Sequence, residues 1–248
     1  MADYCPEFAE VQALAGFDGE TPRLRPPARQ ATVRNLITHT SGLGYWFWSE
    51  DLVRWEKATG IPNVVAGSRF LMNDDQRPNS TPVHVKGEDG TWMSVGEVLN
   101  QEPDYFAGGH GLYGPPSDYI KFERALLRGG ELDGTQILRQ DTVDAAFTNQ
   151  IGELDFPAEL PTADPASACT FTAGPGFKWG YGLLLNTADI PGMRRAWSGG
   201  WAGLCNTQFW VDRTAGVCGS IYSNFLPFVT PEAVKLYNDF ERGVYAAL

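Results

Sequence analysis

The stretch Trp197-Ser198-Gly199-Gly200-Trp201-Ala202-Gly203, followed by the apolar residues 204–211, decides how this sequence folds. Glycine weakens a strand, so it is retained there where a ligand or another backbone comes close. The stretch therefore allows two interpretations: a strand that a ligand approaches, or a glycine-rich turn into an ordinary core strand. On these residues alone the second is simpler, and the rest of the chain has to decide.

Further strands and a terminal helix surround this stretch. We predict strands at 178–186 (KWGYGLLLN), 204–211 and 217–223, the last two joined by the turn D-R-T-A-G. Residues 230–248 predict an amphipathic helix with Thr230 as N-cap and Pro231 in the first turn. Its apolar stripe consists of Val234, Tyr237, Phe240, Val244 and Tyr245. Strands followed by a packed terminal helix indicate an α/β or α+β layer arrangement, with a mostly antiparallel sheet because the connections are short.

The upstream elements are shorter. Residues 1–30 are rich in proline and lack periodicity, which predicts a surface loop. Thr32 is a suitable N-cap for a short helix, and Ser117 for a longer one that Gly129-Gly130 ends. Other expectations are a hairpin tip at 86–90, a helix at about 141–149 and an exposed loop at 152–176.

Composition limits the function classes. The chain has 248 residues, 43% hydrophobic and 20% charged, as a soluble globular protein does, and a formal charge of −11. This acidity argues against nucleic acid or an anionic membrane surface as partner. No run of apolar residues suits a membrane span and the N-terminus lacks the pattern of a signal peptide, so we expect a cytoplasmic protein.

Metal and cofactor sites are not predicted. The cysteines (Cys5, Cys169, Cys205 and Cys218) are scattered without a C-x-x-C pair, which favours reduced thiols. The histidines (His39, His84 and His110) lie far apart and form none of the usual metal-binding patterns. We therefore predict no metal site and no cofactor.

Three stretches together resemble one family. They are LITHTSGLGY at 36–45, GGHGLYGPPSDYIKFERALLRGGELDGTQIL at 108–138, and KWGYGLLLN at 178–186 with WSGGWAGLCNTQFWVD at 197–212. These stretches resemble the serine β-lactamase and penicillin-binding superfamily, and most of all the family VIII carboxylesterases of its class C-like branch. The phrase L-x-T-H-T-S-G-L is fairly specific. The resemblance extends from about residue 30 to the C-terminus, apart from one gap.

The resemblance implies an α+β fold class, in which an antiparallel sheet with the C-terminal helix packed on it meets a mostly helical region. The site lies between the two and is built from three motifs. An S-x-x-K helix supplies the nucleophile and a lysine, and Y-x-N or Y-x-S supplies a general base. The third motif, K-T-G or a variant, lines the cleft and leads to an oxyanion N–H. By resemblance, Trp197, Ser198 and Gly199 occupy the third motif and Gly200 offers the N–H. Tryptophan in place of lysine removes the charge that would bind a β-lactam carboxylate, so a small uncharged acyl ester or amide suits better.

Two of the motifs are missing. No serine begins S-x-x-K, and no G-x-S-x-G exists. The family places S-x-x-K upstream of the region resembling DYCPEF, where this chain begins, so we expect the nucleophile helix and first strands to be absent. The second motif belongs between Leu43 and Gly108, but no tyrosine occurs at 46–104 and Tyr105 precedes Phe-Ala. We expect a deletion near 67–73. Tyr222-Ser223-Asn224 matches Y-x-N only by letters, because it follows the third motif.

Two functions remain. One is a serine hydrolase that uses an unrecognised nucleophile, for which Ser41, Ser117 and Ser198 are the serines near family motifs. The other, which we favour, is a non-catalytic remnant or binding module that uses the former acyl cleft. No catalytic residue is assigned with confidence. We expect a single β-lactamase-like domain over 1–248, with a helical and irregular region at about 30–170 and the sheet and terminal helix at about 176–248. An uncovered sheet edge predicts self-association or marginal stability.

Overall fold

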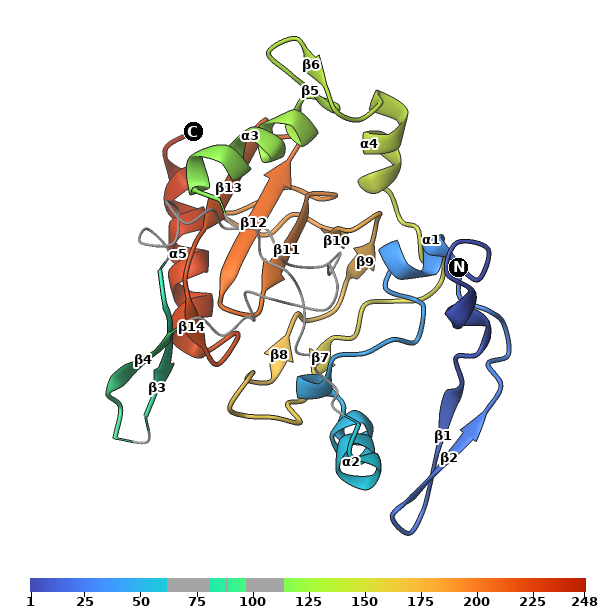
Figure 1. The fold of residues 1–248 in the computed structure, drawn as a ribbon. Coiled ribbons are helices and arrows are strands. Elements are labelled where there is room, and N and C mark those ends of the chain that lie inside the picture. The colour runs from blue at the N-terminus through green and yellow to red at the C-terminus, as the bar shows by residue number, and fades with distance from the viewer. Residues whose placement is uncertain (62–80, 88, 97–113) are drawn as a thin grey trace.

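The computed structural model describes residues 1–61, 81–87, 89–96 and 114–248 (Figure 1). Its centre is a five-stranded antiparallel sheet in the order β13-β12-β11-β10-β9. The strands are β9 (Phe177–Trp179), β10 (Leu184–Asn186), β11 (Gly199–Gly203), β12 (Thr207–Asp212) and β13 (Val217–Ile221). The predicted strand at 178–186 is thus two strands, because residues 180–182 turn between β9 and β10 and Gly182 has φ 72°.

The glycine-rich stretch is itself the strand β11. The predicted strand at 204–211 begins too early, since residues 204–206 form the turn into β12. Glycine is required in β11 by close packing on both faces. A Cβ on Gly199 would lie 2.8 Å from Leu183 Cδ1, and one on Gly200 would lie 2.4 Å from the carbonyl oxygen of Phe209. The periodicity of side chains could not show this strand, because glycine has no side chain to contribute.

Helices cover both faces of the sheet. On one face, α3 (Pro116–Leu127) and α4 (Gln140–Ala146) pack on the largest core cluster, formed by Leu126, Val143, Phe147, Leu183, Leu185 and Val211. On the other face, α5 (Pro231–Ala246) packs on Trp210, whose ring lies 5.9 Å from Tyr237 and 5.7 Å from Phe240. Figure 1 shows α3 and α5 near β13 on either side of it. The predicted α+β fold class is confirmed.

The terminal helix begins as predicted. Thr230 Oγ1 accepts a hydrogen bond from the N–H of Ala233 (3.2 Å), and Pro231 occupies the first position. α3 differs in its start: it begins at Pro116 without a side-chain cap, so Ser117 lies inside the helix.

A second, smaller core packs against Ala202 of β11. Phe47, Ala168, Phe228 and Val229 form it, with a 3-10 helix (Trp46–Trp48) packed against it and α2 (Glu50–Thr59) following. A three-stranded sheet in the order β14-β3-β4 uses β14 (Phe225–Leu226), β3 (Val83–Lys86) and β4 (Trp92–Gly96). The predicted hairpin tip at 86–90 joins β3 to β4, with residue 88 outside the described part.

The N-terminal prediction was wrong. After a 3-10 helix (Pro6–Ala9), the supposed loop contains a hairpin of β1 (Ala13–Asp18) and β2 (Thr21–Arg25). Gly19 has φ 59° and begins a two-residue turn, a geometry that hairpins favour. The segment 152–176 likewise holds a small hairpin of β7 (Glu159–Leu160) and β8 (Phe171–Thr172), and β5 (Glu131–Leu132) pairs with β6 (Thr135–Gln136) before α4. α1 (Val33–Ile37) follows Thr32 as predicted.

Glu123 of α3 is a carboxyl group enclosed against β13. Its exposed fraction is 0%, and neither oxygen is hydrogen-bonded to a residue in the described ranges. Burial raises the pKa of Glu123 to about 7, with the hydroxyl of Ser220 on β13 opposing the rise. Since the ordinary value is 4.5, the folded protein binds more protons than the unfolded chain between about pH 4.5 and 7. Stability is therefore lost as the pH rises through this interval.

We expect the substitution Glu123→Gln to remove this pH dependence. Between pH 5 and pH 8 the wild type should lose on the order of 2 kcal/mol of unfolding free energy relative to the variant. Urea unfolding at the two pH values measures the difference. Glu131→Gln, at an exposed position, is the control and should follow the wild type. Equal pH profiles for wild type and Glu123→Gln would contradict the assignment.

Candidate functional site

The residues after α1 are anchored to the sheet. Thr32 and Asn35 cap the helix reciprocally, through Asn35 N–H to Thr32 Oγ1 (3.1 Å) and Thr32 N–H to Asn35 Oδ1 (3.0 Å). At its other end, the carbonyl of Ile37 accepts hydrogen bonds from Trp179 Nε1 (3.1 Å) and from the N–H of Gly182 (2.9 Å). The T-H-T-S-G-L segment is thereby held against β9 and the turn into β10.

This anchoring builds an aromatic cluster, which we define as His39, Phe156, Trp179 and Trp201. The His39 ring lies over Trp179 with centroids 4.1 Å apart and meets Trp201 edge-on at 5.5 Å. Trp179 and Trp201 meet edge-on at 4.6 Å, and Phe156 stacks on Trp179 at 5.9 Å. Trp201 belongs to β11, so the later half of the glycine-rich strand faces aromatic rings.

His39 is the polar member of the cluster. It adopts φ 54°, and desolvation lowers its pKa, so the imidazole is neutral at pH 7. Its side chain makes no hydrogen bond to the residues whose placement is described. A neutral ring among indoles and a phenyl group offers an apolar surface with one polar edge, which suits an uncharged ligand.

The residues predicted from the third motif lie just before and in the first half of β11, next to β10, and are mostly enclosed. Trp197 is 44% exposed, has φ 63° and donates its N–H to the carbonyl of Asn186 (2.7 Å). Ser198 is 1% exposed, and its hydroxyl donates to the carbonyl of Arg195 (2.7 Å). Gly199 and Gly200 are buried within the ladders to β10 and β12. An oxyanion role for the Gly200 N–H remains a prediction.

None of the three candidate serines is hydrogen-bonded to a lysine in the described ranges, although Ser117 and Lys121 lie one turn apart on α3. Ser41 Oγ accepts the N–H of Leu43 (3.3 Å), and Ser117 is exposed on the first turn of α3. Of the lysines, all of which lie in the described ranges, none hydrogen-bonds a serine or tyrosine hydroxyl there; their charged partners are Glu232, Asp118, Asp155 and Asp239. The expected deletion at 67–73 and the region of Tyr105 lie outside the described residues.

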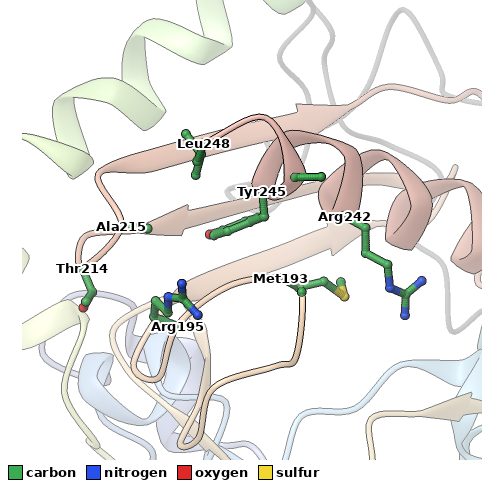
Figure 2. Close-up of a pocket in the computed structure, with 9 residues that line it drawn as sticks. Met193, Arg195, Thr214, Ala215, Arg242, Tyr245 and Leu248 are labelled. Carbon is green, nitrogen blue, oxygen red and sulfur yellow. The ribbon is translucent and has the colours of Figure 1, made fainter.

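A cavity of about 700 Å³ opens on the opposite, α5 side of the sheet (Figure 2). Its wall includes Met193, Arg195, Arg242 and Tyr245. The carboxylate of Asp212 beside it is saturated: it accepts the N–H groups of Arg195 (2.8 Å), Thr214 (3.0 Å) and Ala215 (2.8 Å) and the Tyr245 hydroxyl (2.7 Å). Burial and the bond to Asp212 raise the pKa of Tyr245. These groups support the structure and leave no free base.

A smaller cavity of about 350 Å³ is lined by Arg25, Arg29, Thr40 and Ser41 among others. Within the described ranges, no three His, Cys, Asp or Glu side chains are grouped as metal ligands would be. The same part of the chain contains no helix with the length and apolar character that a membrane crossing requires. The four cysteines are free thiols.

Comparison with known proteins finds relatives that include an esterase and several acyltransferases. A lovastatin esterase from Penicillium rubens is 25% identical over 99% of this chain and 77% of its own length. A monacolin J acid methylbutanoyltransferase from Aspergillus terreus is 24% identical over 97% of this chain and 73% of its own length. The first alignment runs over 313 positions, so the esterase carries extra residues inside the matched region. No family model matches the chain.

Solved structures agree on the fold. A variant of simvastatin synthase from Aspergillus terreus superposes with a TM-score of 0.78 at 21% identity, covering 99% of this chain and 73% of that one. EstCE1, described as a hydrolase with promiscuous acyltransferase activity, gives a TM-score of 0.54 at 16% identity. The chain therefore has the β-lactamase-like fold, and its resemblance to the esterase branch of the serine β-lactamase and penicillin-binding superfamily is confirmed by relatives that are esterases and acyltransferases.

Proposed function

We propose that this chain binds a small uncharged acyl ester or amide against the aromatic cluster, and that its 248 residues do not by themselves complete the catalytic machinery. The observation that carries the proposal is a contrast. The strand and loop that would line an acyl cleft are folded and packed together, yet the sequence contains no S-x-x-K. The names of the relatives, an esterase and an acyltransferase, support acyl groups as the ligand class.

General chemistry supports the proposal that these residues do not complete the catalytic machinery by themselves. A serine needs a neighbouring base to become a nucleophile, and an oxyanion donor alone forms no acyl-enzyme. Ser198, just before β11, is not placed to attack a ligand, because it is enclosed and its hydroxyl is bonded to a backbone carbonyl. Loss of both nucleophile and base leaves only a small residual rate.

The alternative is an active hydrolase or acyltransferase with Ser41 as its nucleophile. Ser41 lines the smaller cavity and follows the T-H-T segment, so it is the better placed of the three serines. Two nearby arginines, Arg25 and Arg29, could stabilise an anion, but the described part of the cavity supplies no lysine or histidine as base. This alternative predicts covalent labelling at Ser41.

The test combines labelling, turnover and binding. We expect no fluorophosphonate labelling and no cleavage of a short-chain nitrophenyl ester by wild type, Ser41→Ala or Ser198→Ala. A short-chain alkyl amide should nevertheless quench tryptophan fluorescence on titration, because Trp201 is partly exposed on the proposed surface, while Trp179 behind it is buried. Trp201→Ala should weaken amide binding about 10-fold or more.

Trp92→Ala is the matched control, because Trp92 is exposed on β4 and packs on Phe225 instead of the aromatic cluster. It should bind the amide as the wild type does. If the fluorophosphonate labels the wild type and Ser41→Ala or Ser198→Ala abolishes this labelling, the proposal that the chain lacks a complete catalytic machinery is overturned. If Trp201→Ala binds the amide as tightly as the wild type does, the proposal that the ligand binds against the aromatic cluster is overturned.

A further inference from the structure

The two outer strands of the main sheet differ in how their free edges are covered. At β9, the carbonyls of Phe177 and Trp179 accept backbone N–H groups from Phe156 (3.1 Å) and Gln150 (2.8 Å). At β13, all five residues pair with β12 in unbroken register. No backbone group of β13 bonds any other residue in the described ranges. Among the described residues, one edge of the sheet is thus closed by the chain, and the other edge carries backbone groups without a partner.

The helices on either side leave apolar side chains beside β13. Tyr119 and Phe122 of α3 are exposed, with Tyr119 in edge-on contact with Tyr222 just past the strand (6.3 Å). On the opposite face, Phe240 of α5 is exposed where it meets Trp210. An unpaired strand between two apolar margins is the arrangement in which added strands dock.

The strand also lacks the features that keep edges apart. Residues 214–231 contain no charged side chain, although the chain has a formal charge of −11. β13 contains no proline and no bulge. Charges, prolines and bulges are the usual protection of a sheet edge. β13 of a second copy can therefore pair with β13 without placing like charges opposite each other in the two strands.

We propose that β13 pairs antiparallel with β13 of a second copy of this chain, across a two-fold axis at Gly219, so that two five-stranded sheets become one continuous sheet. The sequence Val-Cys-Gly-Ser-Ile is self-complementary in this register. Val217 lies opposite Ile221 of the second copy, and Cys218 lies opposite Ser220 of the second copy. Branched aliphatic residues make favourable cross-strand pairs, and a two-fold interface repeats each pair. This interface is independent of the proposed acyl-binding surface.

Two double variants test the register. Val217→Lys with Ile221→Lys places lysine opposite lysine, whereas Val217→Lys with Ile221→Glu places opposite charges in both cross-strand pairs. Analytical ultracentrifugation over a wide concentration range should show a dimer for wild type. The like-charge variant should dissociate about 10-fold or more readily, and the opposite-charge variant should recover the dimer. Circular dichroism and thermal melts confirm that each variant is folded.

Val95→Lys on β4, another exposed strand, is the control and should dimerise as the wild type does. If the variants of β13 fail to fold, hydrogen exchange of wild type at low and high concentration replaces them, with added protection expected at 217–221. A wild type that stays monomeric overturns the proposal. So do equal dimerisation of the two double variants, a dimer lost in Val95→Lys, and exchange at 217–221 that does not change with concentration.

Discussion

Replacing Glu241 by glutamine is expected to destabilise the protein by about 3–5 kcal/mol, because it leaves a buried arginine without its counter-charge. Glu241 is 0% exposed on α5, and both of its oxygens bind Arg194. Oε2 accepts Nη2 at 2.5 Å, and Oε1 accepts Nε at 2.9 Å and the Arg194 backbone N–H at 3.0 Å. The Arg194 guanidinium also donates to the Tyr237 hydroxyl. This network joins the loop before β11 to the terminal helix.

Urea unfolding followed by tryptophan fluorescence measures the loss. Asp239→Ala on the same helix removes the surface partner of Lys235 and should cost about 0.5 kcal/mol or less. Replacing both members of the buried pair, Arg194→Met with Glu241→Leu, should recover part of the stability lost in Glu241→Gln, since no unpaired charge then remains. Equal costs for Glu241→Gln and Asp239→Ala would show that the network contributes nothing.

The same helix shows what a sequence can predict. Thr230, Pro231 and a 3.6-residue stripe place α5 correctly, because capping and amphipathic periodicity are local properties. Glu241 could not be predicted to be buried. Its enclosure depends on Arg194, which lies 47 residues away in the chain and on another element. Local polarity predicts solvent exposure for such a residue, and only the partner makes burial possible.

The candidate site likewise contains parts that the sequence predicts and a part that it does not. The T-H-T-S-G-L phrase and the glycine-rich stretch could be recognised from their residues, and the structure brings Trp201 of the latter against His39 of the former. The contact of Trp201 with His39 could not be predicted from the third motif, because that motif begins at Trp197 and ends before Trp201. The one signal that could have found Trp201 is the second W-x-G, Trp201-Ala202-Gly203, whose tryptophan lies two positions beyond Gly199 and therefore on the same face of the strand.

Gly200→Ala is expected to destabilise the protein by about 3 kcal/mol or more, because the added methyl group has no space. Its Cβ would lie 2.4 Å from the Phe209 carbonyl oxygen and 3.0 Å from Arg194 Nη1, so β11 would have to move away from β12. Gly203→Ala is the matched control in the same strand. There the nearest atom is Thr207 Cβ at 3.8 Å, an ordinary contact, so the cost should be small.

This pair of variants separates two reasons for glycine at position 200. If glycine is present because of packing, Gly200→Ala lowers the urea midpoint strongly and Gly203→Ala does not. If it is present only to offer its N–H to a ligand, alanine keeps that N–H, and the two variants should be equally stable. The geometry favours packing as the reason. The methyl group would strike the carbonyl oxygen of Phe209, which belongs to the backbone of the neighbouring strand β12. A backbone atom in a paired strand cannot move aside as a side chain can. A ligand on this strand would then be bound by Trp201, one residue farther along.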